Sequence, residues 1–261
     1  PELVRDAIPF GLKLYETLLE STPEHRGLLV AAARGFASYA YLLQDDATRL
    51  EASDREGARA LRQRASRLYL RGRDYALRGL EVAHPGFRAA LDTDPAAALA
   101  RTVRDDVPLL YWAAAGQAGA LSAAKGDAEL IADLPLAGAL MQRVLALDEG
   151  YEAGAAHEFL VSYEAGRPGG SIARAREHFA RADALANGER ASLYLSLAES
   201  VSVQEQKLAE FQSLLEKALA VDVERAPQNR MVNVLAQRRA QWLRAHVADL
   251  FLDAESTGGT P

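Results

Sequence analysis

The chain has 261 residues, of which 49 % are hydrophobic, 25 % are charged and 7 % are aromatic, enough apolar material for one large domain or two small ones. Its formal net charge of −6 argues against a nucleic-acid partner, because nucleic-acid-binding domains are usually basic. There is no cysteine, which excludes disulfides and thiolate metal sites, and no apolar stretch reaches the roughly 18 residues that suggest a transmembrane segment.

Helical periodicity predicts three long helices in the first third of the chain. In the first, over residues 3–20, Leu3, Ala7, Phe10, Leu14 and Leu18 share one face, and Pro9 should kink or delay the helix. The second covers residues 28–43 and the third covers residues 55–82, which are rich in arginine. These arginines could form a surface for an anionic ligand, or a solvated face paired with neighbouring acidic residues. The second interpretation is preferred, because Leu61, Leu68, Tyr75 and Leu80 give the helix an apolar stripe that can be buried while the arginines remain in solvent.

Shorter helices are predicted between residues 87 and 147. The sequence DTDP at 92–95 opens an alanine-rich helix, DDVP at 105–108 begins another that continues to Lys125, and a third covers residues 134–147. Gly116 and Gly119 lie inside the second of these helices. Such small residues would let a neighbouring helix approach closely.

Residues 151–222 read as two successive helical hairpins that end at polar turns. The first hairpin ends at Asn187 and the second at Asp222, an interval of 35 residues, close to the roughly 34 of a tetratricopeptide (TPR) repeat. The pattern predicts an all-α fold: an α-solenoid of TPR-like helical hairpins with extra N-terminal helices and a C-terminal capping helix over residues 229–252. We expect residues 1–253 to form a single TPR-like domain and residues 254–261 a disordered tail.

No catalytic motif is present. His157 and Glu158 begin like the helix motif of zinc proteases, but the second histidine that the motif requires is replaced by Val161. The sequence therefore predicts no enzyme activity, no catalytic residue, no metal site and no cofactor.

Two polar residues lie within apolar helical runs. His157 is expected to be a core histidine with a backbone partner, or else a functional group. Glu199 is expected to form a hydrogen bond or ion pair between repeats, or to line a groove.

Short segments spread over most of the chain resemble a known family. They are AAAR at 31–34, DDVP at 105–108 with Tyr111 and Trp112, DLP at 133–135, GAAH at 154–157, ARAREHF at 173–179, SLAESVSV at 196–203, AQRRAQWL at 236–243 and DLF at 249–251. In this order and spacing the chain resembles the TatT family, the TPR-containing accessory proteins of tripartite ATP-independent periplasmic (TRAP) transporters.

The resemblance implies a periplasmic protein, lipid-anchored in its full-length precursor, that typically forms a homotrimer. It implies a TRAP-type periplasmic solute-binding protein as partner. It also implies a channel or cavity for a small ligand, with hydrophobic molecules the expected class. Large apolar walls with few polar groups suit such a cavity. The candidates for these walls are Tyr111, Trp112, His157, Phe159, Tyr163, Tyr194 and Glu199.

Two other functions fit the sequence. A generic TPR module would bind a peptide or protein tail in its groove. A helical enzyme would use His157 and Glu199 as base and acid, although the sequence supplies neither a nucleophile nor a metal ligand set.

Overall fold

The computed structural model describes residues 2–252, with side chains from residue 5 onward. The regular elements of these residues are all helices, so the predicted all-α class is confirmed. The chain divides into two compact units, unit 1 (Pro1–Glu149) and unit 2 (Gly150–Pro261). The single-domain prediction stays a prediction, and the predicted tail at 254–261 lies outside the described residues.

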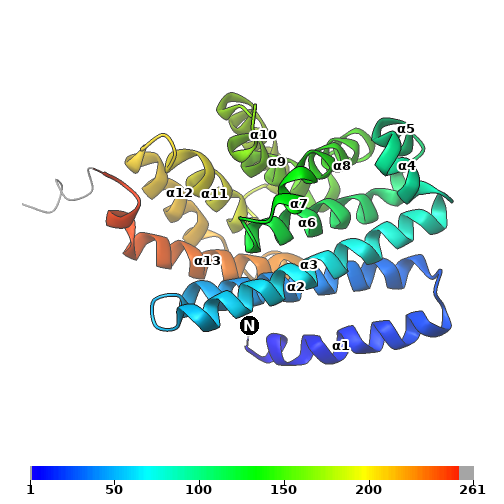
Figure 1. Cartoon of the computed structure of the whole chain (residues 1–261). Helices are drawn as coiled ribbons and strands as arrows, with labels where there is room; N and C mark the ends of the chain where they lie inside the picture. The colour runs from blue at the N-terminus through cyan, green and yellow to red at the C-terminus, as the bar shows by residue number, and fades with distance from the viewer. Residues whose placement is uncertain (1, 253–261) are drawn as a thin grey trace, which may run out of the picture. The chain divides into compact units, whose positions relative to one another are not determined.

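Unit 1 is built around three long helices that pack side by side, with shorter helices added to them (Figure 1). They are α1 (Glu2–Ser21), α2 (Arg26–Leu50), α3 (Arg55–Ala83), α4 (Phe87–Thr93), α5 (Pro95–Ala100), α6 (Val107–Ala123), α7 (Ala128–Ala132) and α8 (Leu134–Leu147). Helix α2 packs on both α1 and α3, and α6 packs on α3, α2 and α8.

Side chains cap several of these helices where the sequence predicts a start. Asp54 accepts from the backbone N–H of Gly57 at 2.8 Å and begins α3, and Asp94 accepts from Ala97 at 3.0 Å and begins α5. Asp127 caps α7 in the same way, a helix that the sequence analysis missed. Helix α2 continues past its predicted end because Asp45 and Asp46 pair with Arg49 one turn later.

The predicted apolar stripe of α1 faces outward. Phe10 is 78 % exposed, Leu14 48 % and Leu18 43 %, whereas the same helix buries Leu12 and Leu19. The helix also runs without delay through Pro9. Periodicity identified a shared face correctly, but the packing of α1 on α2 uses the opposite side.

The glycines of α6 do permit a close approach, as predicted. A β-carbon on Gly116 would lie 2.8 Å from the backbone oxygen of Tyr69 in α3, and one on Gly119 would lie 2.5 Å from the Tyr69 ring. Such distances leave no room for a methyl group, so α3 and α6 pack directly at this point.

A buried carboxylate ties together the segment DDVP that opens α6. Asp106 is fully buried, and it accepts from Arg26 Nη2 at 2.5 Å and from the backbone N–H of Val103 at 2.8 Å. The Nε2 atom of His84, which ends α3, lies 2.7 Å from Oδ2 of Asp106, the oxygen that also accepts from Val103. One side chain thereby joins α2, the end of α3 and the start of α6.

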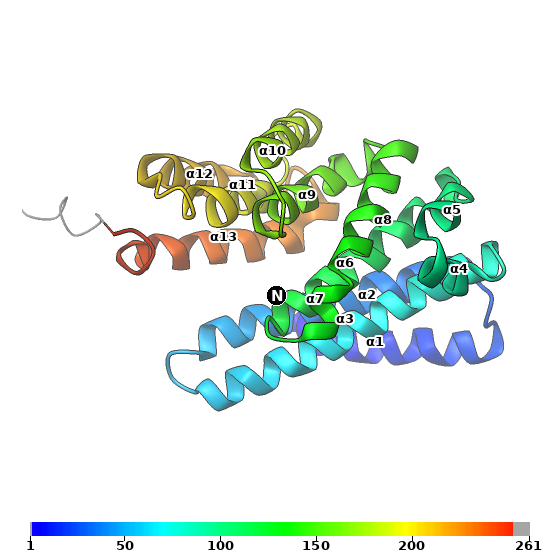
Figure 2. The same ribbon diagram turned by 45° about the horizontal axis from the view of Figure 1, so that its top comes forward.

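Unit 2 contains two successive helix pairs and a final helix. The elements are α9 (Ala155–Gly166), α10 (Ile172–Ala186), α11 (Ala191–Leu197), a π-helical segment η3 (Ala198–Ser202), α12 (Leu208–Ala220) and α13 (Arg230–Ala245). Helix α9 packs on α10 and α11 packs on α12, while α13 lies along α11 and α12 (Figure 2). Phe211, Leu214, Leu215 and Ala218 of α12 are all buried, as their spacing predicts.

The last helix is shorter than predicted. It ends at Ala245 instead of continuing to Leu252, and a 3-10 turn (Val247–Asp249) follows. This turn brings Phe251 back against Phe211 of α12, with ring centroids 5.0 Å apart. Among residues 2–252, no helix combines the length and the apolar character that a membrane span requires.

Candidate functional site

A pair of histidines lies between α9 and α10 of unit 2. His157 is 6 % exposed, and its Nδ1 atom lies 2.8 Å from Nδ1 of His178. One ring must therefore donate and the other accept, which requires at least one neutral imidazole. Burial, and then the charge of His157, lowers the pKa of His178. His157 is buried as predicted, and its contact with a second histidine was not predicted.

Glu164 of α9 forms a second polar centre nearby in the same helix pair. Its carboxylate is 5 % exposed, and it accepts from Arg167 Nη2 at 2.9 Å and from Arg174 Nε at 2.8 Å. Burial by itself raises the pKa of Glu164, but the hydrogen bonds from the two arginines outweigh it and lower the pKa overall. Glu164 is not among the predicted site residues. The signal in the sequence was a carboxylate followed by Arg167, just after α9, and by Arg174 in α10.

Glu199 lies in the π-helical segment η3 and is largely exposed. It accepts from Nε of Arg239 in α13 at 2.9 Å, and the same guanidinium lies over the Trp242 ring at 4.4 Å from its centroid. Glu199 therefore forms an ion pair with Arg239, which is one of the two roles expected for it. A π-helical turn often marks a functional position, because the extra residue changes where side chains point.

Three of the predicted cavity residues are aromatic side chains of unit 2. Phe159 and Tyr163 stack within α9 with ring centroids 6.0 Å apart. Tyr194 belongs to the core of unit 2, where its ring meets Phe179 and its hydroxyl donates to Asp183 at 3.1 Å. Burial, followed by the interaction with Asp183, raises the pKa of Tyr194.

The other two aromatic candidates belong to unit 1. Tyr111 and Trp112 are half-buried neighbours in α6, with their rings edge to face and 5.1 Å between centroids. The seven predicted residues thus lie in several local groups, each with contacts of its own. The proposed acid and base, His157 and Glu199, contact different partners, His178 and Arg239.

Several polar side chains in the segments that carry the family resemblance form hydrogen bonds with other parts of unit 2. Arg176 pairs with Glu210 at 2.7 Å, Ser202 donates to the same carboxylate at 2.8 Å, and Gln237 donates to the carbonyl of Val221 at 2.7 Å. The GAAH segment begins at Gly154, which has a φ of 85° and where a β-carbon would lie 3.1 Å from Leu185. Both the left-handed backbone and the close approach of α10 require glycine there.

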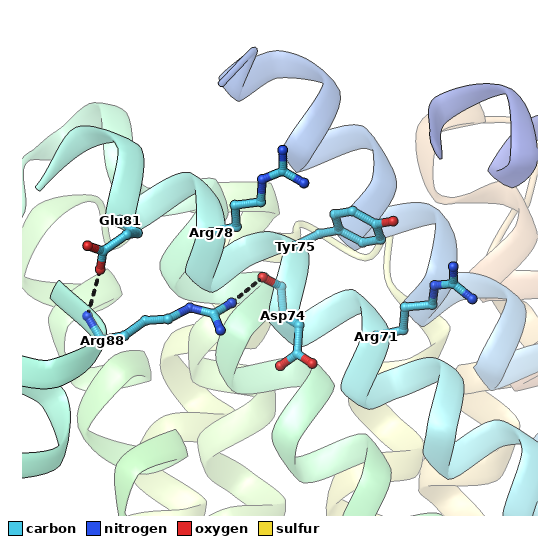
Figure 3. Close-up of a pocket in the computed structure, with 6 residues that line it drawn as sticks. All are labelled: Arg71, Asp74, Tyr75, Arg78, Glu81 and Arg88. Carbon is cyan, nitrogen blue, oxygen red and sulfur yellow. Dashed lines mark hydrogen bonds between the residues drawn. The ribbon is translucent and has the colours of Figure 1, made fainter. Parts of the chain in front are cut away.

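Two pockets formed by described residues of unit 1 are lined by none of the seven predicted residues. One, of about 460 Å³, is lined by Arg71, Asp74, Tyr75, Arg78, Glu81 and Arg88 (Figure 3). The other, of about 500 Å³, is mainly apolar and is lined by Leu91, Asp92, Pro95, Ala132, Asp133, Pro135, Leu136 and Ala139. Within residues 2–252, no group of three histidine, aspartate or glutamate side chains is arranged to hold a metal ion.

Comparison with known proteins gives two similarities that extend over nearly the whole chain. A family described as the TRAP transporter T-component matches residues 1–251. An uncharacterized protein of Treponema pallidum (strain Nichols) is 34 % identical over 260 residues, which cover 97 % of this chain and 80 % of that relative.

Proposed function

Because the chain belongs to the TatT family of TRAP transporter T-components, we propose that it is a non-enzymatic periplasmic accessory protein that binds the solute-binding protein of its transport system. Membership in the family makes the chain an accessory component of a TRAP transporter. The family match over residues 1–251 is the observation that carries the proposal.

The helix pairs of unit 2 support a TPR-like scaffold for this role. Helices α9 and α10 form one pair and α11 and α12 the next, and α13 packs on the second pair. Stacked helical hairpins generate extended surfaces that bind other proteins. In this proposal α13 is the capping helix of the stack.

The outward stripe of α1 supports the homotrimer. Phe10, Leu14 and Leu18 form an exposed apolar row along one face, and interfaces between copies of one chain are more apolar than those of transient complexes. We therefore assign this face to a second copy of the chain. Replacing Phe10 and Leu14 by serine should convert trimer to monomer in light scattering, with Glu20→Ser as the control on the same helix. An unchanged trimer in the double variant would exclude α1 from the interface.

The proposal includes a cavity for a small, hydrophobic ligand, with walls drawn from the seven residues named above. The mainly apolar pocket of about 500 Å³ in unit 1 has a size suited to such a molecule. Its lining includes none of the seven residues, so it supports the class of ligand and not the predicted walls. Native mass spectrometry of the purified protein should detect a bound lipid-like species. Finding no such species, together with no binding of the apolar probe N-phenyl-1-naphthylamine, would contradict this part of the proposal.

The decisive experiment is a titration with the solute-binding protein of a TRAP transporter from the same organism. We expect a saturable complex by calorimetry at micromolar concentration, and no binding of a solute-binding protein from an unrelated transporter. Absence of a complex at high micromolar concentration would overturn the proposal. Binding of an extended peptide by the monomer would instead favour a generic TPR module.

The proposed location is the periplasm, with a lipid anchor in the full-length precursor. Fractionation of cells that produce the native gene should recover the protein with periplasmic or membrane-attached material. Recovery in the cytoplasmic fraction would contradict this location.

A further inference from the structure

A pocket on the arginine-rich helix α3 combines positive charge with an aromatic ring. Five of its six lining residues come from α3, and Arg88 comes from the start of α4. In Figure 3 the side chains of Arg71 and Arg78 extend to the same side of α3, with the ring of Tyr75 between them. The pocket therefore presents three guanidinium groups and two carboxylates around one aromatic side chain.

Both carboxylates of the pocket are occupied by other groups. Glu81 accepts from the backbone N–H groups of Gly86 at 2.6 Å and Arg88 at 2.9 Å, and these hydrogen bonds lower the pKa of Glu81. Asp74 accepts from both Nε and Nη2 of its neighbour Arg73, at 3.0 and 2.9 Å. Neither carboxylate pairs with the guanidinium groups of the pocket.

Two of the three guanidinium groups, those of Arg78 and Arg88, have no carboxylate partner among residues 5–252. The side chain of Arg78 makes no hydrogen bond or ion pair within the part of the chain that the structure describes. Arg88 donates to the backbone oxygen of Asp74 at 2.7 Å but contacts no carboxylate among residues 5–252. Arg71 pairs with Glu16, which also accepts from Lys13 and Tyr75.

The α3 arginines were expected to form either a surface for an anionic ligand or a solvated face paired with acidic residues. Individual arginines of the helix differ in this respect. Arg62 pairs with Glu51 and Arg73 with Asp74, as the solvated-face interpretation requires. Arg78 has no such partner and faces a pocket. An arginine fork is suited to bidentate binding of a carboxylate or phosphate, and it retains its charge at all accessible pH values.

We propose that the pocket lined by Arg71, Tyr75, Arg78 and Arg88 binds a small organic anion, whose carboxylate or phosphate contacts Arg78. The volume of about 460 Å³ lies in the range of small-molecule pockets and exceeds that of a single inorganic anion. The half-buried Tyr75 ring, stacked on Phe36 at 5.5 Å between centroids, offers an apolar surface for the body of the ligand. Arg88 and Arg71 supply additional positive charge.

This site is independent of the proposed transport role, because it lies within unit 1 and needs no solute-binding protein. Its test therefore uses the purified full chain alone. Failure of anion binding would leave complex formation with the solute-binding protein unaffected, and the reverse also holds.

The test is calorimetric titration with benzoate, phenyl phosphate and neutral benzyl alcohol at constant ionic strength. We expect at least one of the two anions to bind and benzyl alcohol not to bind. The preferred anion distinguishes a carboxylate ligand from a phosphate ligand. Binding of neither anion, or equal binding of the neutral analogue, would overturn the proposal.

Substitutions of the pocket arginines test whether the anion binds in this pocket. Arg78→Gln should weaken anion binding by about ten-fold or more, because it removes a charged hydrogen-bond donor, and Arg88→Gln should also weaken it. The control is Arg59→Gln, about 28 Å away along the same helix. Arg78→Lys keeps the charge and should bind the anion with intermediate affinity. It provides the test if Arg78→Gln does not fold. Equal affinity in the wild type and the Arg78 variants would refute the assignment.

Discussion

The Nδ1 atoms of His157 and His178 are 2.8 Å apart, so their hydrogen bond exists only while at least one ring is neutral. Burial and then His157 lower the pKa of His178, and Arg174 acts in the same direction. Glu164 and Glu177 act in the opposite direction. The balance favours the neutral ring, which makes the folded state of unit 2 sensitive to acid.

The first prediction concerns this pH dependence. A histidine with a lowered pKa in the folded state binds fewer protons there than in the unfolded chain, so stability falls as pH falls from about 6.5 through the folded-state pKa. His178→Gln should reduce the loss of urea-unfolding free energy between pH 7.5 and 5.5. As a control, Gln204→Asn changes an exposed residue that does not titrate and should retain the full loss. A pH dependence that survives unchanged in His178→Gln would contradict this account.

The second prediction concerns Glu164, whose buried carboxylate is held by Arg167 and Arg174. Both arginines are partly exposed, so the charge interaction is screened and Glu164→Gln should cost about 1–3 kcal/mol of unfolding free energy. Because the pKa of Glu164 is lowered, this stabilisation is present above the unfolded pKa of about 4.3 and is lost as pH falls through the folded value. Chemical denaturation at pH 7, with Glu177→Gln at an exposed site as control, measures the difference. Equal losses in the two variants would show that the arginines do not stabilise Glu164.

At the level of elements, the contact of α6 with α3 depends on a small residue. A methyl group on Gly116 would lie 2.8 Å from the backbone oxygen of Tyr69, and this atom cannot move aside as a flexible side chain could. The cost of overpacking should therefore exceed the gain in helix propensity that alanine brings.

The third prediction compares two glycines that both lie inside helices. Gly116→Ala should destabilise the protein by about 1–3 kcal/mol, whereas Gly11→Ala should stabilise it by about 0.5–1 kcal/mol. A β-carbon on Gly11 would have no atom within 4 Å. Thermal unfolding of the two variants measures the contrast, and a stabilising Gly116→Ala would show that α3 and α6 can separate at little cost.

At the level of the whole molecule, the open question is whether the two compact units unfold together. Trp112 lies in unit 1 and Trp242 in unit 2, and the chain contains no further tryptophan. Each residue can therefore report on its own unit when the other is replaced by phenylalanine.

The fourth prediction follows from the single-domain hypothesis for residues 1–253. Urea unfolding followed by fluorescence should give the same midpoint for Trp112→Phe and Trp242→Phe, because coincident transitions characterise two-state unfolding. Circular dichroism of each variant provides the control for any stability change caused by the substitution. Two separate midpoints would show that the units are independent domains.

The sequence by itself determined the all-α class, most helix starts and the family. Capping residues such as Asp54 and Asp94 act on backbone groups only a few positions away, so the sequence contains all the information needed. The ends of α2 and α13 were less predictable. Ion pairs extend α2, and the return of Phe251 to Phe211 follows the early end of α13.

Only the tertiary structure decided which way the faces point and which distant residues meet. Periodicity grouped Phe10, Leu14 and Leu18 on one face of α1, but the packing of α1 on α2 left that face exposed. The partners of His157 and Glu199 are His178 and Arg239, 21 and 40 residues away. Arg78 stands in a pocket without an acidic partner among the described residues. Helical spacing defines neighbours within one helix, whereas contacts between helices depend on how the helices pack.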